Sequence, residues 1–158
     1  MAVRVSVLAV LTALSCGCMR GQIIDHGPRE ATASVSDRSL WRFAGDFSDA
    51  GNAADNDVLT VATSSATPTS HLQIDLGKPC VFNLIVIDHG PDYEQAFPGK
   101  LVVQTSYDGR DWNDEPAVAG TRRITYILLS GPRLARYIRL QTQVRGDSPW
   151  TVAEVYVQ

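Results

Sequence analysis

Alternation of apolar and polar residues is the dominant pattern over most of this chain. In residues 71–76, Leu72, Ile74 and Leu76 fall on one face and polar residues on the other, which predicts a half-buried β-strand. Residues 81–87 are almost continuously apolar, which predicts a central strand covered on both faces. Further strands are predicted at residues 100–107, 123–129, 135–142 and 151–157.

Short turns separate these segments. Gly77, Lys78 and Pro79 end the strand at 71–76, and Asp108 with Gly109 predicts a tight turn. No helical periodicity is sustained over ten residues. Strands joined by turns, without helices between them, predict an all-β fold, an antiparallel β-sandwich formed by residues 31–158.

The N-terminal segment has a different pattern. A positive start and an apolar run over residues 5–14, too short to span a bilayer, predict a signal peptide over residues 1–17. Two cysteines follow, and their position predicts that Cys18 becomes the lipidated first residue of the mature protein. One alternative is lipidation at Cys16, and another is secretion without a lipid. Residues 18–30 then form a polar tether. We therefore expect a secreted bacterial envelope lipoprotein, held at the outer membrane or cell surface by its lipid alone.

Composition narrows the class of protein. The 158 residues are 44% hydrophobic and 20% charged, which is typical of a globular domain. The formal net charge of -3 offers no basic stripe, so we expect no nucleic-acid partner. After removal of the signal peptide, Cys18 and Cys80 would remain. We expect no disulfide framework, and a buried free thiol at Cys80.

Four separate segments, in order and at natural spacing, resemble one family. They are LQIDLG (72–77), TSYDGRDW (105–112), ARYIRL (135–140) and PWTVAEVY (149–156). Together they resemble the discoidin domain, also called the coagulation-factor C-domain, whose fold is shared by family 32 carbohydrate-binding modules. The resemblance covers nearly all of residues 31–158 and implies a jelly-roll β-sandwich with a binding function.

An acidic loop predicts a metal site. Residues 52–60 hold Asp55, Asp57 two positions later and the hydroxyl of Thr60. Calcium takes six to eight oxygen ligands, so the loop needs a further ligand from elsewhere. Glu154 is the candidate, because a carboxylate inside an apolar strand is costly unless it is paired or metal-bound.

The resemblance extends this ligand set. Many discoidin-like carbohydrate modules hold a structural calcium ion between this loop and the last strand, which implies the backbone carbonyls of Asn52 and Ala153 as further ligands. The alternative is that Asp55 and Asp57 are ordinary turn acids and that Glu154 caps a loop by hydrogen bonds.

Ligand binding is expected at the loops of one end of the sandwich, as the family implies. The aromatic or charged candidates are Trp41, Phe43, Tyr93, Phe97 and Arg145. Trp41 and Phe43 have the alternative role of covering the end of the fold. Residues 60–63 lack the histidine that galactose-binding members often carry, so the resemblance does not extend to galactose.

These features predict a non-catalytic binding module for a glycan or cell-surface polysaccharide, and the alternative is a protein-interaction or adhesion lipoprotein that uses the same loops. His26, His71 and His89 do not form a recognisable Ser-His-Asp or Cys-His arrangement. We therefore expect no enzymatic activity.

Overall fold

The computed structural model describes residues 34–65, 69–93, 96–144 and 149–158, so the predicted signal peptide, lipidated cysteine and tether lie outside the described residues. Almost all regular structure in the described ranges is β-strand, with three short 3-10 helices. No described helix is long and apolar enough to cross a membrane. The elements, in chain order, are η1 (Arg38–Leu40), β1 (Arg42–Gly45), β2 (Phe47–Ser48), η2 (Ala50–Ala54), β3 (Ala62–Ser64), β4 (His71–Asp88), η3 (Pro91–Tyr93), β5 (Lys100–Ser106), β6 (Asn113–Val118), β7 (Ile124–Val144), β8 (Thr151–Val152) and β9 (Glu154–Val157).

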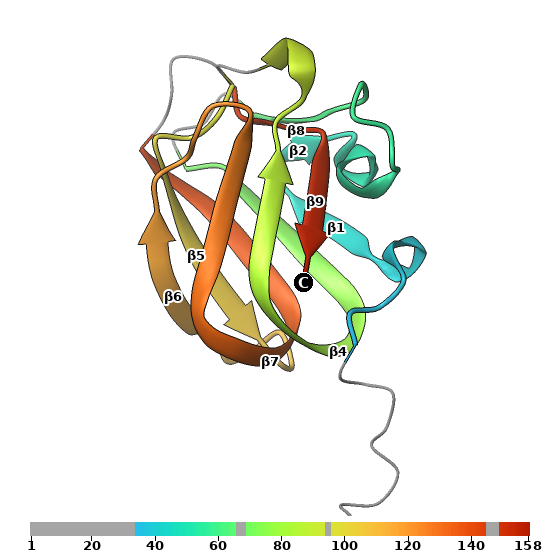
Figure 1. Cartoon of the computed structure of the whole chain (residues 1–158), viewed down its shortest axis with the longest axis vertical. Helices are drawn as coiled ribbons and strands as arrows, with labels where there is room; N and C mark the ends of the chain where they lie inside the picture. The colour runs from blue at the N-terminus through green and yellow to red at the C-terminus, as the bar shows by residue number, and fades with distance from the viewer. Residues whose placement is uncertain (1–33, 66–68, 94–95, 145–148) are drawn as a thin grey trace, which may run out of the picture.

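The main sheet is built on the two long strands β4 and β7. Its order is β1-β4-β7-β5-β6, with β9 also paired to β4, and every pairing is antiparallel. A smaller sheet has the order β2-β3-β8. Both long strands bend at the bottom of Figure 1, so that residues 84–88 of β4 and 124–128 of β7, with β9, lie in front of the layer that holds β1, β5 and β6. The predicted antiparallel β-sandwich is confirmed.

The predicted turn at 77–79 lies inside one continuous strand. Residues 71–75 of β4 pair with 137–141 of β7, and residues 84–88 pair with 124–128, with register shifts between the stretches. Gly77 has a φ of 79°, a backbone conformation that favours glycine, and it lies at this bend. The predicted strands at 71–76 and 81–87 are therefore two stretches of β4, and those at 123–129 and 135–142 are two stretches of β7.

The core fills the space between the two layers. Leu72, Ile74 and Leu76 are fully buried, as their alternation predicted, and Ile85 and Ile127 face them from the other layer. Cys80 is buried with a free thiol, which confirms that prediction.

The prediction that residues 81–87 are covered on both faces is wrong for the outer face. Ile85 and Ile87 are buried, but Leu84 and Val86 are only partly buried, because among the described residues no element packs over that side of the strand. The apolar outer positions of this strand therefore need an explanation other than the core.

Candidate functional site

The predicted acidic loop places several oxygen atoms close together. The Asp55 carboxylate accepts a hydrogen bond from the Asp57 backbone N–H at 2.9 Å and one from the Thr60 hydroxyl at 2.7 Å. The same hydroxyl lies 2.9 Å from the Asp57 carbonyl oxygen. Burial opposes ionisation of Asp55, but these hydrogen bonds outweigh it and hold the pKa of Asp55 below its usual range. The loop thus gathers a carboxylate, a hydroxyl and a carbonyl around one point.

Glu154 approaches this loop from the last strand. Its side chain is fully buried, one carboxylate oxygen (Oε2) pairs with Arg38, and the other (Oε1) is buried without a partner. Burial raises the pKa of Glu154, Arg38 and the Asn56 backbone N–H act in the opposite direction, and the neighbouring Asp55 charge adds a smaller increase. A buried carboxylate oxygen without a partner is costly, so the site is suited to a further positive charge.

Arg38 ties the loop to the last strand. Its guanidinium donates to the Asn56 side-chain oxygen at 2.8 Å and to the Ala53 carbonyl at 3.3 Å, in addition to its pairing with Glu154. The guanidinium also lies 4.8 Å from the centre of the Tyr156 ring, within the range of a cation–π contact. Sequence reasoning missed Arg38, because 116 positions separate it from Glu154.

The remaining predicted metal ligands take different roles. The Asp57 carboxylate accepts from the Leu59 backbone N–H at 3.0 Å, so only its carbonyl points toward Thr60. The Asn52 amide donates to the Val61 carbonyl at 3.1 Å. Ala153 is buried, and its N–H donates to the Asp88 carbonyl. Within the described ranges, no three His, Cys, Asp or Glu side chains cluster as metal ligands, so a cation here would depend on carbonyl and hydroxyl oxygens as well.

A polar groove lies beside the small sheet. It has a volume of about 330 Å³ and is lined by Gly45, Asp46, Phe47, Ser48, Thr63, Ser64 and Ser65. The Asp46 carboxylate lies 2.7 Å from the His71 ring nitrogen Nδ1 and accepts from the His71 backbone N–H at 3.2 Å. Below the groove, the Phe47 ring packs edge-on against Trp150, with centroids 5.0 Å apart. A carboxylate and several hydroxyls around one opening can hydrogen-bond a polar ligand.

Of the five predicted ligand-binding residues, the four that the structure describes do not line this groove. Trp41 is only 4% exposed, and its indole N–H donates to the Ser36 hydroxyl at 3.0 Å, so its ring is part of the core and offers no face to a ligand. Phe43 is half-buried against the core. Tyr93 is 41% exposed, Phe97 is half-buried, and Arg145 lies outside the described residues. The groove was missed because most of its residues are small and polar and give little signal in the sequence.

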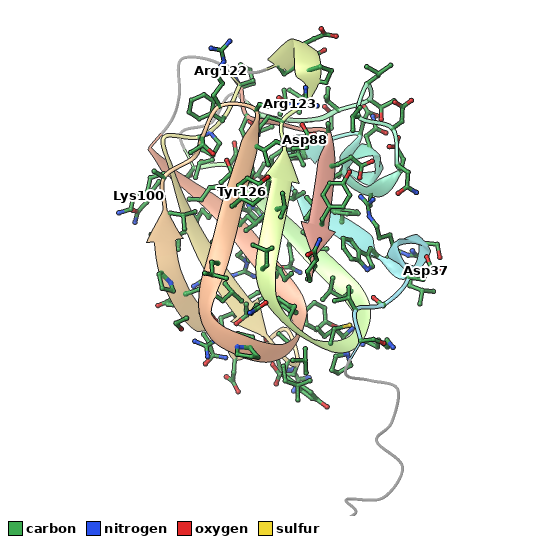
Figure 2. The ribbon with its side chains drawn as sticks, in the orientation of Figure 1. Asp37, Asp88, Lys100, Arg122, Arg123 and Tyr126 are labelled. Carbon is green, nitrogen blue, oxygen red and sulfur yellow. The ribbon has the colours of Figure 1, made fainter. Side chains whose placement is uncertain are left out.

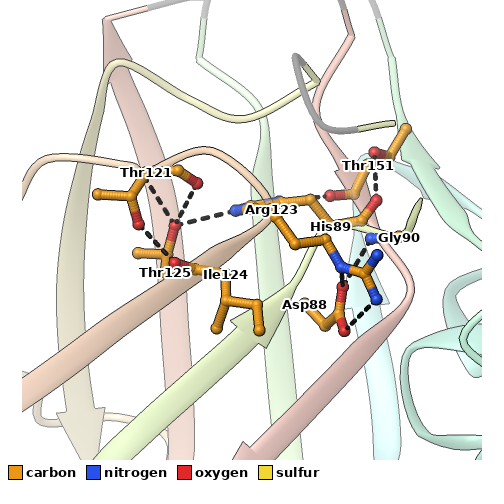
Figure 3. Close-up of polar contacts among 8 residues, drawn as sticks. All are labelled: Asp88, His89, Gly90, Thr121, Arg123, Ile124, Thr125 and Thr151. Atoms are coloured by element: carbon orange, nitrogen blue, oxygen red, sulfur yellow. Dashed lines mark hydrogen bonds and ion pairs between the residues drawn. The ribbon is translucent and has the colours of Figure 1, made fainter. Parts of the chain in front are cut away.

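A buried polar network fixes the loop end of the sandwich (Figure 3). The His89 ring lies 2.8 Å from the Thr151 carbonyl and 2.9 Å from the Thr125 hydroxyl. Asp88 forms two hydrogen bonds with Arg123, whose φ of 65° is unusual for a residue with a side chain. Burial lowers the pKa of His89, with smaller opposing effects from Thr151 and Asp88. His89 is fully buried and both its ring nitrogens have partners, so this network is structural.

Known proteins share this architecture. The F5/8 type C domain family matches residues 30–155. The family 32 module of Clostridium perfringens NanJ, solved in complex with galactose, is 16% identical, with a TM-score of 0.68 over 79% of this chain and 97% of that one. A chitosan-binding module from a Paenibacillus chitosanase/glucanase is 20% identical, with a TM-score of 0.63 over 80% of this chain and 97% of that one. No curated protein sequence matches the chain.

Proposed function

The chain belongs to the F5/8 type C (discoidin) domain family, and from that premise we propose that it is a non-catalytic module that binds carbohydrate. The observation that carries the proposal is the shared fold: two modules solved with bound sugar or named for binding chitosan superpose on this chain with TM-scores of 0.68 and 0.63.

We propose the groove beside Asp46 as the sugar contact. Sugar hydroxyls are both donors and acceptors, and the groove offers the Asp46 carboxylate as an acceptor and the serine and threonine hydroxyls as both. His71 fixes the orientation of Asp46 through the 2.7 Å contact of its ring nitrogen. Phe47, held against Trp150, supplies an apolar edge to the groove.

A glycan array tests this proposal. Purified protein should bind at least one glycan class, and Asp46→Ala should weaken that binding. Asp114→Ala is the matched control, because Asp114 is an exposed carboxylate on β6 whose partner is Gln104. Absence of binding to every glycan, or equal loss with both variants, would contradict the proposal. A co-purifying protein in place of a glycan would favour the alternative, a protein-interaction module.

We propose in addition a structural calcium ion between the acidic loop and the last strand. Four oxygens support it: the Asp55 carboxylate, the Asp57 carbonyl, the Thr60 hydroxyl and the unpartnered buried oxygen of Glu154. The Thr60 hydroxyl lies 2.7 Å from the Asp55 carboxylate and 2.9 Å from the Asp57 carbonyl, so it brings these three oxygens into one part of the loop. The carbonyls of Asn52 and Ala153 are the further proposed ligands.

The melting temperature in calcium and in chelator tests this site. Calcium should raise the melting temperature, and Asp55→Ala should abolish that rise. Asp57→Asn is the informative comparison. This variant keeps the backbone carbonyl proposed as the ligand, so the rise in melting temperature with calcium should persist. An equal melting temperature in calcium and chelator would reject the site.

The proposed cellular location is the bacterial envelope, with Cys18 as the lipidated residue. This proposal depends on the sequence pattern of the N-terminal segment. Incorporation of labelled palmitate should be lost with Cys18→Ser and retained with Cys16→Ser. The reverse result would assign the lipid to Cys16, and no incorporation into the unaltered chain would leave plain secretion.

A further inference from the structure

The guanidinium of Arg38 lies between the acidic loop and the last strand. Arg38 is the first residue of η1, and Asp37, which caps this short helix, is labelled at the right of Figure 2. From this position the side chain reaches Glu154 on β9, the Asn56 side-chain oxygen and the Ala53 carbonyl. One cationic group therefore joins oxygen atoms of two segments that are far apart in the sequence.

Arg38 holds together the same two segments as the proposed calcium ion. Arg38 pairs with one carboxylate oxygen of Glu154, Oε2, and the ion would bind the other, Oε1, which is buried without a partner. The guanidinium and the ion would therefore share a single carboxylate. Two cations on one carboxylate repel each other, and the repulsion is stronger where water is excluded.

Burial makes this pairing important for the fold. The Glu154 side chain is fully buried, and the Arg38 side chain is only 19% exposed. Removal of one partner of a buried ion pair is strongly destabilising, because the other charge remains buried without compensation. The Arg38 guanidinium also lies 4.8 Å from the centre of the Tyr156 ring and 5.7 Å from that of Trp41, and these aromatic contacts help to fix its position.

The site keeps an excess of negative charge beside Arg38. Asp55 is close enough to Glu154 for its charge to act on that carboxyl group. The Asp55 carboxylate itself accepts from the Thr60 hydroxyl and the Asp57 backbone N–H, and neither donor carries a positive charge. Arg38 therefore reduces the negative charge at the end of β9 without cancelling it, so the site still attracts a divalent cation.

We propose, with the calcium site of the proposed function as the premise, that Arg38 is an internal counter-ion that competes with calcium at Glu154. Arg38 already compensates the buried carboxylate, so the module folds without the ion. Calcium binds beside a positive charge, which lowers its affinity. The ion also adds less stability than it would add to a buried carboxylate that has no other cation.

Calcium titration of an Arg38 variant tests this competition. Arg38→Met removes the charge and keeps an unbranched apolar side chain beside the Tyr156 and Trp41 rings. The variant should have a lower melting temperature in chelator, because Glu154 then has no cation. It should also lower the calcium dissociation constant, measured by isothermal titration calorimetry, by about tenfold or more, because the repulsion between the two cations is lost.

Arg42→Met is the matched control. Arg42 is an exposed arginine on β1, and its guanidinium donates to the carbonyls of Ser39 and Trp41. This variant changes the net charge of the protein by the same amount as Arg38→Met. It should leave the calcium dissociation constant unchanged, and an equal gain in affinity with both variants would assign the effect to net charge and overturn the proposal.

A second variant tests the pairing even if Arg38→Met unfolds in chelator. Arg38→Met combined with Glu154→Gln removes both charges, so no uncompensated carboxylate remains buried. The double variant should melt at a higher temperature in chelator than Arg38→Met alone, and calcium should no longer raise its melting temperature. No recovery in chelator would overturn the proposal, because Glu154 would then not be the group that Arg38 compensates.

The outcomes separate the competition from the calcium site itself. If Arg38→Met binds calcium with equal or lower affinity than the unaltered chain, the competition is overturned and the calcium site remains. If neither protein binds calcium, the calcium site is rejected and the competition with it. If only Arg38→Met binds calcium, the competition is supported in its strongest form, because Arg38 then takes the place of the ion in the unaltered chain.

Discussion

Strands β4 and β7 pair in two stretches that share one core and differ on their outer faces. The first stretch pairs residues 71–75 with 137–141, and the second pairs residues 84–88 with 124–128. In the first stretch the outward side chains are polar and paired: Arg136 forms two hydrogen bonds with Asp75, at 2.7 and 2.8 Å, and Arg139 donates to Gln73 at 3.0 Å. In the second stretch Leu84, Val86, Tyr126 and Leu128 point outward and form an apolar surface, here called the apolar face. The same pair of strands therefore supports both surfaces, so the apolar one is not a requirement of the fold.

Trp112 beside the first stretch and Tyr126 in the second differ in the same way, although Tyr156 beside the second stretch has the Arg38 guanidinium 4.8 Å from its ring. In the first stretch the Arg139 guanidinium lies 3.9 Å from the centre of the Trp112 ring, which covers that apolar ring with a charged group. In the second stretch Tyr126 remains 65% exposed. A surface residue that is covered from within the chain contributes to stability, whereas an uncovered one is available to a partner.

The largest effects are expected in the shared core. Ile138 and Ile127 are nearly fully buried, in the first and second stretch respectively. Ile138→Ala and Ile127→Ala should each lower the free energy of unfolding by about 2–4 kcal/mol, because each removes buried methyl groups and leaves a cavity. Chemical denaturation measures both. If only one of the two variants lowered the free energy of unfolding, the two stretches would not share a core.

A smaller effect is expected from His89 at the end of the second stretch. Burial lowers its pKa in the folded chain, whereas the unfolded chain protonates it near pH 6.5. Below that pH the unfolded chain binds more protons, so stability should fall by up to about 1.4 kcal/mol per pH unit until the folded-state pKa is reached. Melting curves between pH 7.5 and 5.5 measure this loss.

The pH effect has a matched control in the first stretch. His89→Gln should remove the loss of stability between pH 7.5 and 5.5, while His71→Asn should retain it, because His71 is partly exposed beside Asp46. Equal pH dependence in both variants would contradict the assignment to His89.

The polar face of the first stretch should contribute less. Arg136 holds the pKa of Asp75 below its usual range, although burial opposes this. The pair is partly exposed, at 23% for Asp75 and 36% for Arg136, so solvent screening limits its contribution. Asp75→Asn should lower stability by about 0.5–1 kcal/mol at pH 7, and the difference should vanish as the pH falls through the range in which Asp75 protonates. Denaturation at pH 7 and pH 3 measures it.

The smallest effect on stability is expected at the apolar face itself. Leu128→Thr changes a side chain that is 68% exposed and should alter the free energy of unfolding by less than about 0.5 kcal/mol at low protein concentration. Chemical denaturation measures this change. A large loss of stability in dilute protein would show that Leu128 is covered within the monomer, which would remove the contrast between the two stretches.

Much of the fold could be predicted from local sequence patterns. Alternation at Leu72, Ile74 and Leu76 depends only on the period of a strand, and it placed these residues in the core correctly. The bend at Gly77 could not be predicted. A glycine inside a bent strand and a glycine that ends a strand give the same signal in the sequence. For that reason two strands were predicted where β4 is one.

The acidic residues of the candidate site could be predicted from the sequence, whereas Arg38 could not. Asp55 and Thr60 are close in sequence, and Glu154 was conspicuous as an acid in an apolar strand, so the loop and the last strand could be associated. Arg38 and the groove beside Asp46 depend on contacts between distant segments. Trp41 illustrates the same limit, since only packing decided that its ring is in the core.

By itself the sequence determined that this protein is an antiparallel β-sandwich, because strand periodicity and turn residues are local properties. Only the tertiary contacts show that Arg38 pairs with Glu154, that a groove opens beside Asp46, and that Tyr126 and Leu128 stay exposed among the described residues. Those features depend on which stretches lie side by side after the long strands bend, and no local pattern contains that information.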